Sequence, residues 1–160
     1  MIKHTIFYIY IKNLHKWDKS LKKFKVNIMN QKVLQIVAAI PGLLMLNNAI
    51  GFIANPEGTA ASLGMPLLEG MALSTQIGDL GAFFLCSASF IFYGAYKSNP
   101  ILLSAAASML GIAAIMRLVA WGFHGADFAT VFITVEVVIT VWLVVCAYLL
   151  APKSLESKTE

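Results

Sequence analysis

Four long apolar stretches dominate the chain, and short segments rich in polar residues, glycine or proline separate them. The stretches cover residues 33–53, 76–96, 101–121 and 128–150. Each is close to the roughly 20 residues that an α-helix needs to cross the ~30 Å hydrocarbon layer of a membrane. The pattern predicts an all-α fold, a four-helix transmembrane bundle with up-down topology over residues 33–150.

Local signals predict where these helices begin, end and bend. Asn99 is placed to cap the third helix, and Pro100 suits its first position, where the missing N–H would be unpaired in any case. Asp127 is expected to cap the fourth helix, and Pro152 to end it. Pro41 lies inside the first helix and should kink it, because proline removes a backbone hydrogen bond.

The longest connection, residues 54–75, keeps several apolar side chains. They predict a short turn of helix that lies on the outer surface or caps the bundle, and they are Met65, Leu67, Leu68, Met71 and Leu73.

The third helix is rich in small residues. Its pairs Ser104-xxx-Ser108 and Ala107-xxx-Gly111 allow two helix backbones to approach closely in lipid. We therefore expect this helix to be the central packing helix.

The composition supports a membrane location. The chain has 160 residues, of which 59% are hydrophobic and 12% charged, and its mean hydropathy is +0.76. A soluble domain usually has about 25% charged residues, so much of this surface must face lipid. The two cysteines, Cys86 and Cys146, match no metal or redox motif. Their expected depths are too different for a disulfide, and we interpret both as small buried hydrophobic residues.

Positive charge is concentrated at the N-terminus. Residues 1–32 hold eight lysines and one acid, a net +7, whereas the rest has four basic and seven acidic residues, a net −3, which together give the formal +4. The positive-inside rule places this arm in the cytoplasm. Lys97 and the polar tail, residues 151–160, fall on the same side, so both termini are expected to be cytoplasmic. The arm should favour anionic lipid head groups; the sequence has no nucleic-acid-binding motif.

Two alternatives concern the origin of the arm. Met29 precedes a stretch that would be complete without residues 1–28, so the arm is either native or a dispensable extension from a misassigned start. A cleaved signal peptide is disfavoured, because cleavage after Ala54 would put Phe52 where a small residue is expected.

Polar residues inside the apolar helices form the candidate site. At a rise of 1.5 Å per residue, the polar residues inside the four helices lie roughly 21–25 Å from the inner helix ends. This depth corresponds to the outer third of the membrane. His124 and Asp127 should lie just above them. The layer consists of Asn47, Asn48, Asp79, Arg117 and Glu136.

Such a layer has three interpretations. Arg117 and its carboxylates either lock helices together, or bind a ligand, proton or ion, or take part in catalysis with His124 as acid or base. The chain contains no GxSxG, HExxH, Walker or CxxC motif. His124, Asp127 and Glu136 have no recognised metal-ligand spacing, so neither a metal nor a cofactor is predicted.

The stretch from Gly78 to Val138 resembles a bacterial family of small four-helix membrane proteins of unknown function. The likeness lies in Gly78-Asp79-Leu80-Gly81, Arg117, the loop from Gly122 to Asp127, and Glu136. DoxX-like bundles are a more distant likeness. The resemblance implies a bundle in the bacterial cytoplasmic membrane and supplies no activity.

The sequence as a whole favours a non-enzymatic membrane protein that binds a small polar ligand or a membrane partner protein. The alternatives are a proton-coupled small-solute transporter and, third, a membrane-embedded enzyme.

Overall fold

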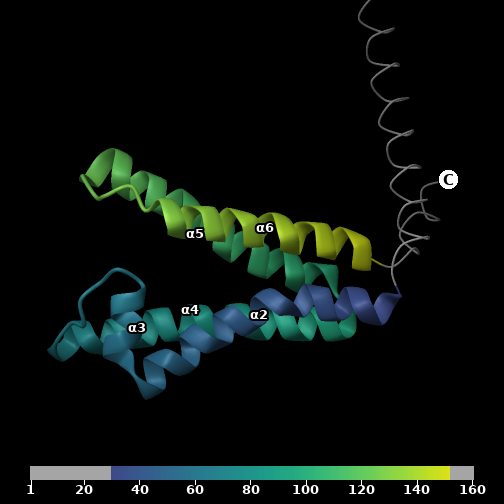
Figure 1. Ribbon diagram of the computed structural model, residues 1–160, viewed down its shortest axis with the longest axis horizontal. Coiled ribbons are helices and arrows are strands. Elements are labelled where there is room, and N and C mark those ends of the chain that lie inside the picture. The colour runs from purple at the N-terminus through teal and green to yellow at the C-terminus, as the bar shows by residue number, and fades with distance from the viewer. Residues whose placement is uncertain (1–29, 152–160) are drawn as a thin grey trace, which may run out of the picture. The chain divides into compact units, whose positions relative to one another are not determined.

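The computed structural model describes residues 30–151, and within them the chain forms five α-helices and no strand (Figure 1). Nearly all of the described residues belong to one compact unit, which begins at Leu34. The basic arm and the polar tail, including Pro152, lie outside the described residues. The helices are α2 (Gln31–Ala54), α3 (Pro56–Ser62), α4 (Gly70–Lys97), α5 (Pro100–His124) and α6 (Thr130–Leu150).

Four of these helices, α2, α4, α5 and α6, are long and apolar enough to cross a membrane. The protein is therefore a multi-pass membrane protein, as its sequence predicts. Helix α4 has 28 residues and begins at Gly70 rather than at residue 76.

The short helix lies earlier than expected. Helix α3 begins at Pro56, and the side chain of Asn55 caps it by accepting a hydrogen bond from the backbone N–H of Gly58 at 3.1 Å. The prediction of a short helix around Met65–Leu73 is wrong, because Asn-Pro supplies a stronger helix start than the apolar residues that follow it. Residues 71 and 73 belong instead to the first turns of α4.

The expected caps of α5 and α6 have different outcomes. Asn99 caps α5 as predicted, since its side chain accepts from the backbone N–H of Ile101 at 3.0 Å. The Asp127 cap is wrong: α6 begins at Thr130 with Ala129 at the N-cap position. A cap must directly precede the first helical residue, and the chain after Gly125 stays non-helical for four residues, which leaves Asp127 exposed.

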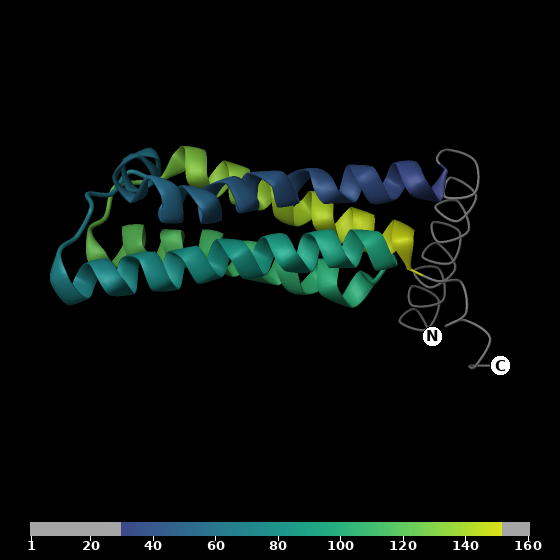
Figure 2. The same cartoon turned by 90° about the horizontal axis from the view of Figure 1, so that it is seen from below.

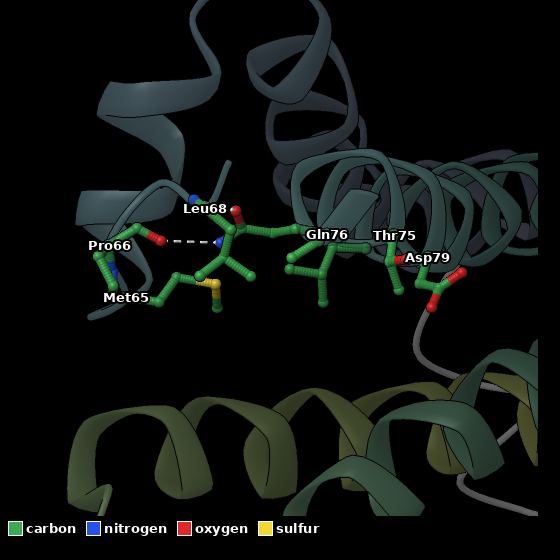
Figure 3. Close-up of a pocket in the computed structure, with 8 residues that line it drawn as sticks. Met65, Pro66, Leu68, Thr75, Gln76 and Asp79 are labelled. Atoms are coloured by element: carbon green, nitrogen blue, oxygen red, sulfur yellow. Dashed lines mark hydrogen bonds between the residues drawn. The ribbon is translucent and has the colours of Figure 1, made fainter. Parts of the chain in front are cut away.

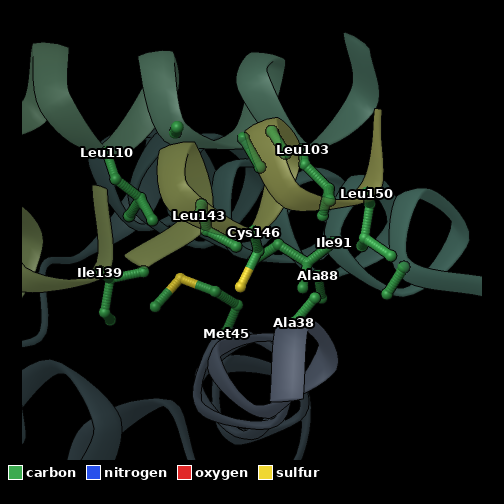
Figure 4. Close-up of a cluster of buried hydrophobic side chains, with 14 of the residues drawn as sticks. Ala38, Met45, Ala88, Ile91, Leu103, Leu110, Ile139, Leu143, Cys146 and Leu150 are labelled. Carbon is green, nitrogen blue, oxygen red and sulfur yellow. The ribbon is translucent and has the colours of Figure 1, made fainter. Parts of the chain in front are cut away.

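The core fills the space between the four long helices, in the half that contains the α4–α5 turn (Figures 2 and 4). Helix α5 packs against both α4 and α6, in keeping with its small residues. A Cβ atom on Gly42 of α2 would stand 2.9 Å from the Phe92 ring of α4, so the missing side chain lets these helices touch. The largest fully buried apolar side chains are Phe52, Ile91, Leu103, Leu110 and Leu143.

The two cysteines are free, and no disulfide joins them, as expected. Cys146 is buried in the core. Cys86 is exposed on α4, contrary to the expectation that both are buried, because it lies on the face of α4 that turns away from the other helices.

A hydrogen bond between helices compensates for the proline in α2. Helix α2 continues through Pro41, but Pro41 has no N–H to donate to the carbonyl of Val37, four residues earlier. The indole Nε1 of Trp142 on α6 donates to that carbonyl at 3.2 Å. In a membrane, where water cannot satisfy a free carbonyl, this bond fixes α6 against α2.

We predict that Trp142→Phe lowers the free energy of unfolding in detergent by about 0.5–1.5 kcal/mol, because it leaves the Val37 carbonyl unpaired. In a Pro41→Ala background the same change should cost much less, since the new N–H of residue 41 pairs with Val37 inside α2. Trp121→Phe is the matched control, because the Trp121 indole makes an edge-on contact with Phe128 at 5.2 Å and no hydrogen bond within the described residues. An equal loss in both backgrounds would contradict the pairing.

Candidate functional site

An ion pair between α5 and α6 is the centre of the candidate site. The Arg117 Nε donates to both carboxylate oxygens of Glu136, at 2.9 Å and 3.1 Å. The Glu136 side chain is 13% exposed and that of Arg117 34%. Of the intramembrane residues predicted from the sequence, these are the two that the structure joins.

The neighbouring side chain of Phe132 on α6 helps to hold this pair in place. The Phe132 ring, one helical turn before Glu136, lies under the guanidinium with 4.8 Å between the ring centroid and Arg117 Cζ. Such a cation–π contact favours a charged guanidinium in a place with little water. Phe132 also approaches Gly64 of the loop between α3 and α4, residues 63–69, where a Cβ atom would stand 3.7 Å from the ring. We call it the outer loop, after the orientation predicted from the sequence. The ring therefore connects the loop with the ion pair.

Close helix packing brings the pair together. The Thr140 hydroxyl donates to the Glu136 carbonyl at 2.7 Å, within α6, and lies 3.4 Å from the Ala107 carbonyl of α5. Gly111 faces the same threonine, and a Cβ atom there would stand 3.4 Å from its methyl group. The Ala107-xxx-Gly111 pair thus forms the contact between α5 and α6, about two turns from the ion pair.

Most of the hydrogen-bonding capacity of Arg117 is unused. A guanidinium has five N–H donors, of which four are on the terminal nitrogens. Only Nε has an acceptor within the described residues. Among residues 30–151, no side-chain nitrogen or oxygen that lacks a hydrogen-bond partner is fully buried. The unpaired terminal nitrogens of Arg117 therefore reach the surface. The fork of Arg117 is therefore accessible and free to bind an oxygen ligand.

The other predicted residues lie apart from the pair. Asn47 is exposed on α2, and the Asn48 amide donates to the Leu44 carbonyl of its own helix at 3.0 Å. His124 and Asp127 are both exposed, with no side-chain hydrogen bond or ion pair to any described residue.

Asp79 lies level with Arg117 although it does not touch it. The Ser87 hydroxyl of α4 contacts the Met109 sulfur of α5 at 3.9 Å, which sets the register of these antiparallel helices. Asp79 is eight residues from Ser87 and Arg117 eight from Met109, both toward the outer end. The side chain of Asp79 is exposed and has no partner within the described residues.

The two asparagines lie deeper than the charged residues. Phe52 of α2 stacks on Phe84 of α4 with 6.3 Å between the ring centroids. Four residues from this contact, toward the α4–α5 turn, lie Asn48 on α2 and Ala88 on α4, so these two residues are at the same level. Ala88 is nine residues, or about 13 Å, from Asp79 along α4. The layer expected from the sequence is thus reduced to three charged residues.

Gln76 is a further residue of this region, and it was not among the residues predicted from the sequence. Its side-chain oxygen accepts from the Leu68 N–H and its side-chain nitrogen donates to the Pro66 carbonyl, both at 3.0 Å. The side chain is 7% exposed. These two bonds hold the outer loop, residues 63–69, on α4 (Figure 3). A glutamine in an apolar helix was the signal available in the sequence.

No family model, curated protein or solved structure matches this chain. A function for the protein therefore has to be inferred from the geometry of the described residues.

We predict that Glu136→Gln lowers the free energy of unfolding by about 1–3 kcal/mol, because it removes the charge that balances Arg117 in a partly buried position. The double variant Arg117→Met with Glu136→Gln should recover most of this loss. Glu69→Gln, which removes an exposed carboxylate at the start of α4 where it makes no cap hydrogen bond, is the matched control for net charge. Thermal melting in detergent measures the wild type and these three variants, and a double variant no more stable than Glu136→Gln would contradict an energetic coupling of the pair.

We also predict that Gln76→Leu exposes the outer loop. Hydrogen–deuterium exchange at the Leu68 amide should become at least about tenfold faster, which corresponds to about 1.4 kcal/mol of lost protection. Thr75→Val is the control, because the Thr75 hydroxyl donates to Met71 within α4 at 3.2 Å and not to the loop. Unchanged exchange in Gln76→Leu would show that other contacts hold the loop.

Proposed function

We propose that this protein is a membrane binding protein for an amphiphile with an anionic head, a phosphate or a carboxylate, which Arg117 recognises. The observation that carries the proposal is the guanidinium that Glu136 and Phe132 hold in place while its terminal N–H groups stay unpaired. Such a fork suits the two oxygens of a phosphate or carboxylate.

The position of Arg117 fits a ligand that enters from the membrane. Arg117 lies seven residues before the end of α5 at His124, or about 10 Å along the helix. Here the α5–α6 pair diverges from α2 and α4 (Figure 1). An anionic head group is thus within reach of the guanidinium while its acyl chain stays in the hydrocarbon layer.

The proposed orientation follows the distribution of lysines. Both termini lie in the cytoplasm of a bacterial cell, and the up-down bundle directs Arg117, Glu136 and the loop after α3 to the outer face. The basic arm contacts anionic lipid head groups at the inner face. An accessory role toward a membrane partner protein agrees with the same arrangement.

The packing favours binding over transport. In the inner half, side chains such as Leu103, Leu143 and Leu150 fill the space between the helices. A proton-coupled carrier would need a polar path through this half. The described polar side chains there bond mainly within the bundle, as when Gln35 donates to the Tyr96 carbonyl at 3.0 Å.

Lipid binding to the purified full chain tests this proposal. Native mass spectrometry should show a tightly bound phosphatidylglycerol or oleate, and Arg117→Gln should weaken it at least about tenfold, the effect of losing about 1.4 kcal/mol. Lys97→Gln removes the same charge from the other end of the bundle and should change affinity much less.

Two comparisons identify what is recognised. Displacement of the lipid by millimolar inorganic phosphate would indicate a free phosphate as the ligand, and resistance would indicate an amphiphile. Equal binding of phosphatidylcholine and phosphatidylglycerol, unaffected by Arg117→Gln, would refute recognition of the anionic head by Arg117.

A further inference from the structure

A pocket between the outer loop and α4 forms a second candidate site, separate from the ion pair (Figure 3). Its volume is about 510 Å³, within the roughly 300–1,000 Å³ typical of small-molecule sites. Most of its wall is apolar, and the apolar lining residues are Met65, Pro66, Leu68, Ala72 and Leu80.

Three polar side chains line this pocket, and only one is free. Gln76 uses both ends of its amide to hold the loop. The Thr75 hydroxyl donates to the Met71 carbonyl within α4. The Asp79 carboxylate has no donor within the described residues, although it lies in a helix apolar enough to cross a membrane. An unpaired charge in such surroundings is costly, so it calls for a partner of opposite charge.

We infer that this pocket binds a lipophilic organic cation, whose ammonium or phosphonium centre pairs with Asp79 while its apolar groups contact the loop and α4. The negative charge of an ionised carboxylate attracts a cation and repels an anion. The carboxylate also has no hydrogen-bond donor to offer an anion. The apolar wall selects an organic ion over a metal ion. No group of three or more His, Cys, Asp or Glu side chains suitable for a metal occurs among residues 30–151.

The carboxylate of this pocket is a different one from the carboxylate that holds Arg117. Arg117 has its own carboxylate in Glu136, at 2.9 Å, and forms no ion pair with Asp79. Asp79 therefore keeps its charge available to the pocket. Loss of the anion site should leave the cation site intact, so the two proposals can fail separately.

Equilibrium dialysis of the full chain in a neutral detergent, with tetraphenylphosphonium as the probe, tests this site. The protein should bind the probe in preference to neutral triphenylphosphine oxide. Asp79→Asn should weaken binding at least about tenfold, which corresponds to about 1.4 kcal/mol, because it removes the attraction between opposite charges in a medium of low dielectric constant. Asp79→Glu, which keeps the charge, should retain most of the affinity. It keeps the inference testable if the Asp79→Asn variant fails to fold.

Matched variants separate the site from general charge effects. Glu69→Gln removes an exposed carboxylate at the start of the same helix, where it makes no cap hydrogen bond, and should change affinity less than about twofold, or 0.4 kcal/mol. Arg117→Gln should not weaken tetraphenylphosphonium binding, because Asp79 and not Arg117 holds the cation. Equal effects of Asp79→Asn and Glu69→Gln, or wild-type affinity in a folded Asp79→Asn protein, would overturn the inference. Binding that is much tighter in Arg117→Gln would also overturn it, by showing that Asp79 is the partner of Arg117.

Discussion

The structure depends on one constraint: inside a membrane, each backbone polar group must find its partner within the protein. Helix formation satisfies most of these groups, and side chains satisfy the exceptions. Trp142 supplies the donor that Pro41 lacks, and Gln35 donates to Tyr96 near the end of α4. These bonds are directional, so together with the close packing of small residues they fix which helix lies beside which.

Under this constraint, the few groups that stay unpaired are informative. The serine and threonine hydroxyls in the helices mostly return to a carbonyl of their own helix, as Ser89 does to Leu85 and Ser108 to Ser104. Two charged groups in the long helices also lack a partner within the described residues: the terminal nitrogens of Arg117 and the carboxylate of Asp79. Both lie at one level, away from the α4–α5 turn and from most of the core. Unsatisfied charge at this position indicates binding capacity better than any single motif in the sequence.

The sequence predicted the helices well, because length and hydropathy alone determine whether a segment can span a bilayer. It also predicted the Asn99 cap. It grouped Arg117 with two carboxylates, of which the structure pairs Glu136 with Arg117 and leaves Asp79 apart. The Phe52–Phe84 contact places Asn47 and Asn48 at a different depth from the one expected, because counting from helix ends assumes that all four helix ends lie at one level. Asp127 failed as a cap because helix starts depend on backbone geometry over several residues. Gln76 and Trp142 were missed because their partners are backbone groups, which no sequence pattern reveals.

The charges in the outer half explain how the two proposed sites influence each other. Asp79, Arg117 and Glu136 together carry −1 when all are ionised, and the ion pair accounts for one charge of each sign. An anion bound at Arg117 raises the total to −2, which costs energy in a medium of low dielectric constant. A cation at Asp79 restores it to −1, so occupation of either site favours occupation of the other, to the same extent in both directions. A zwitterionic ligand, or a lipid anion together with an organic cation, would therefore satisfy this region better than either charge alone.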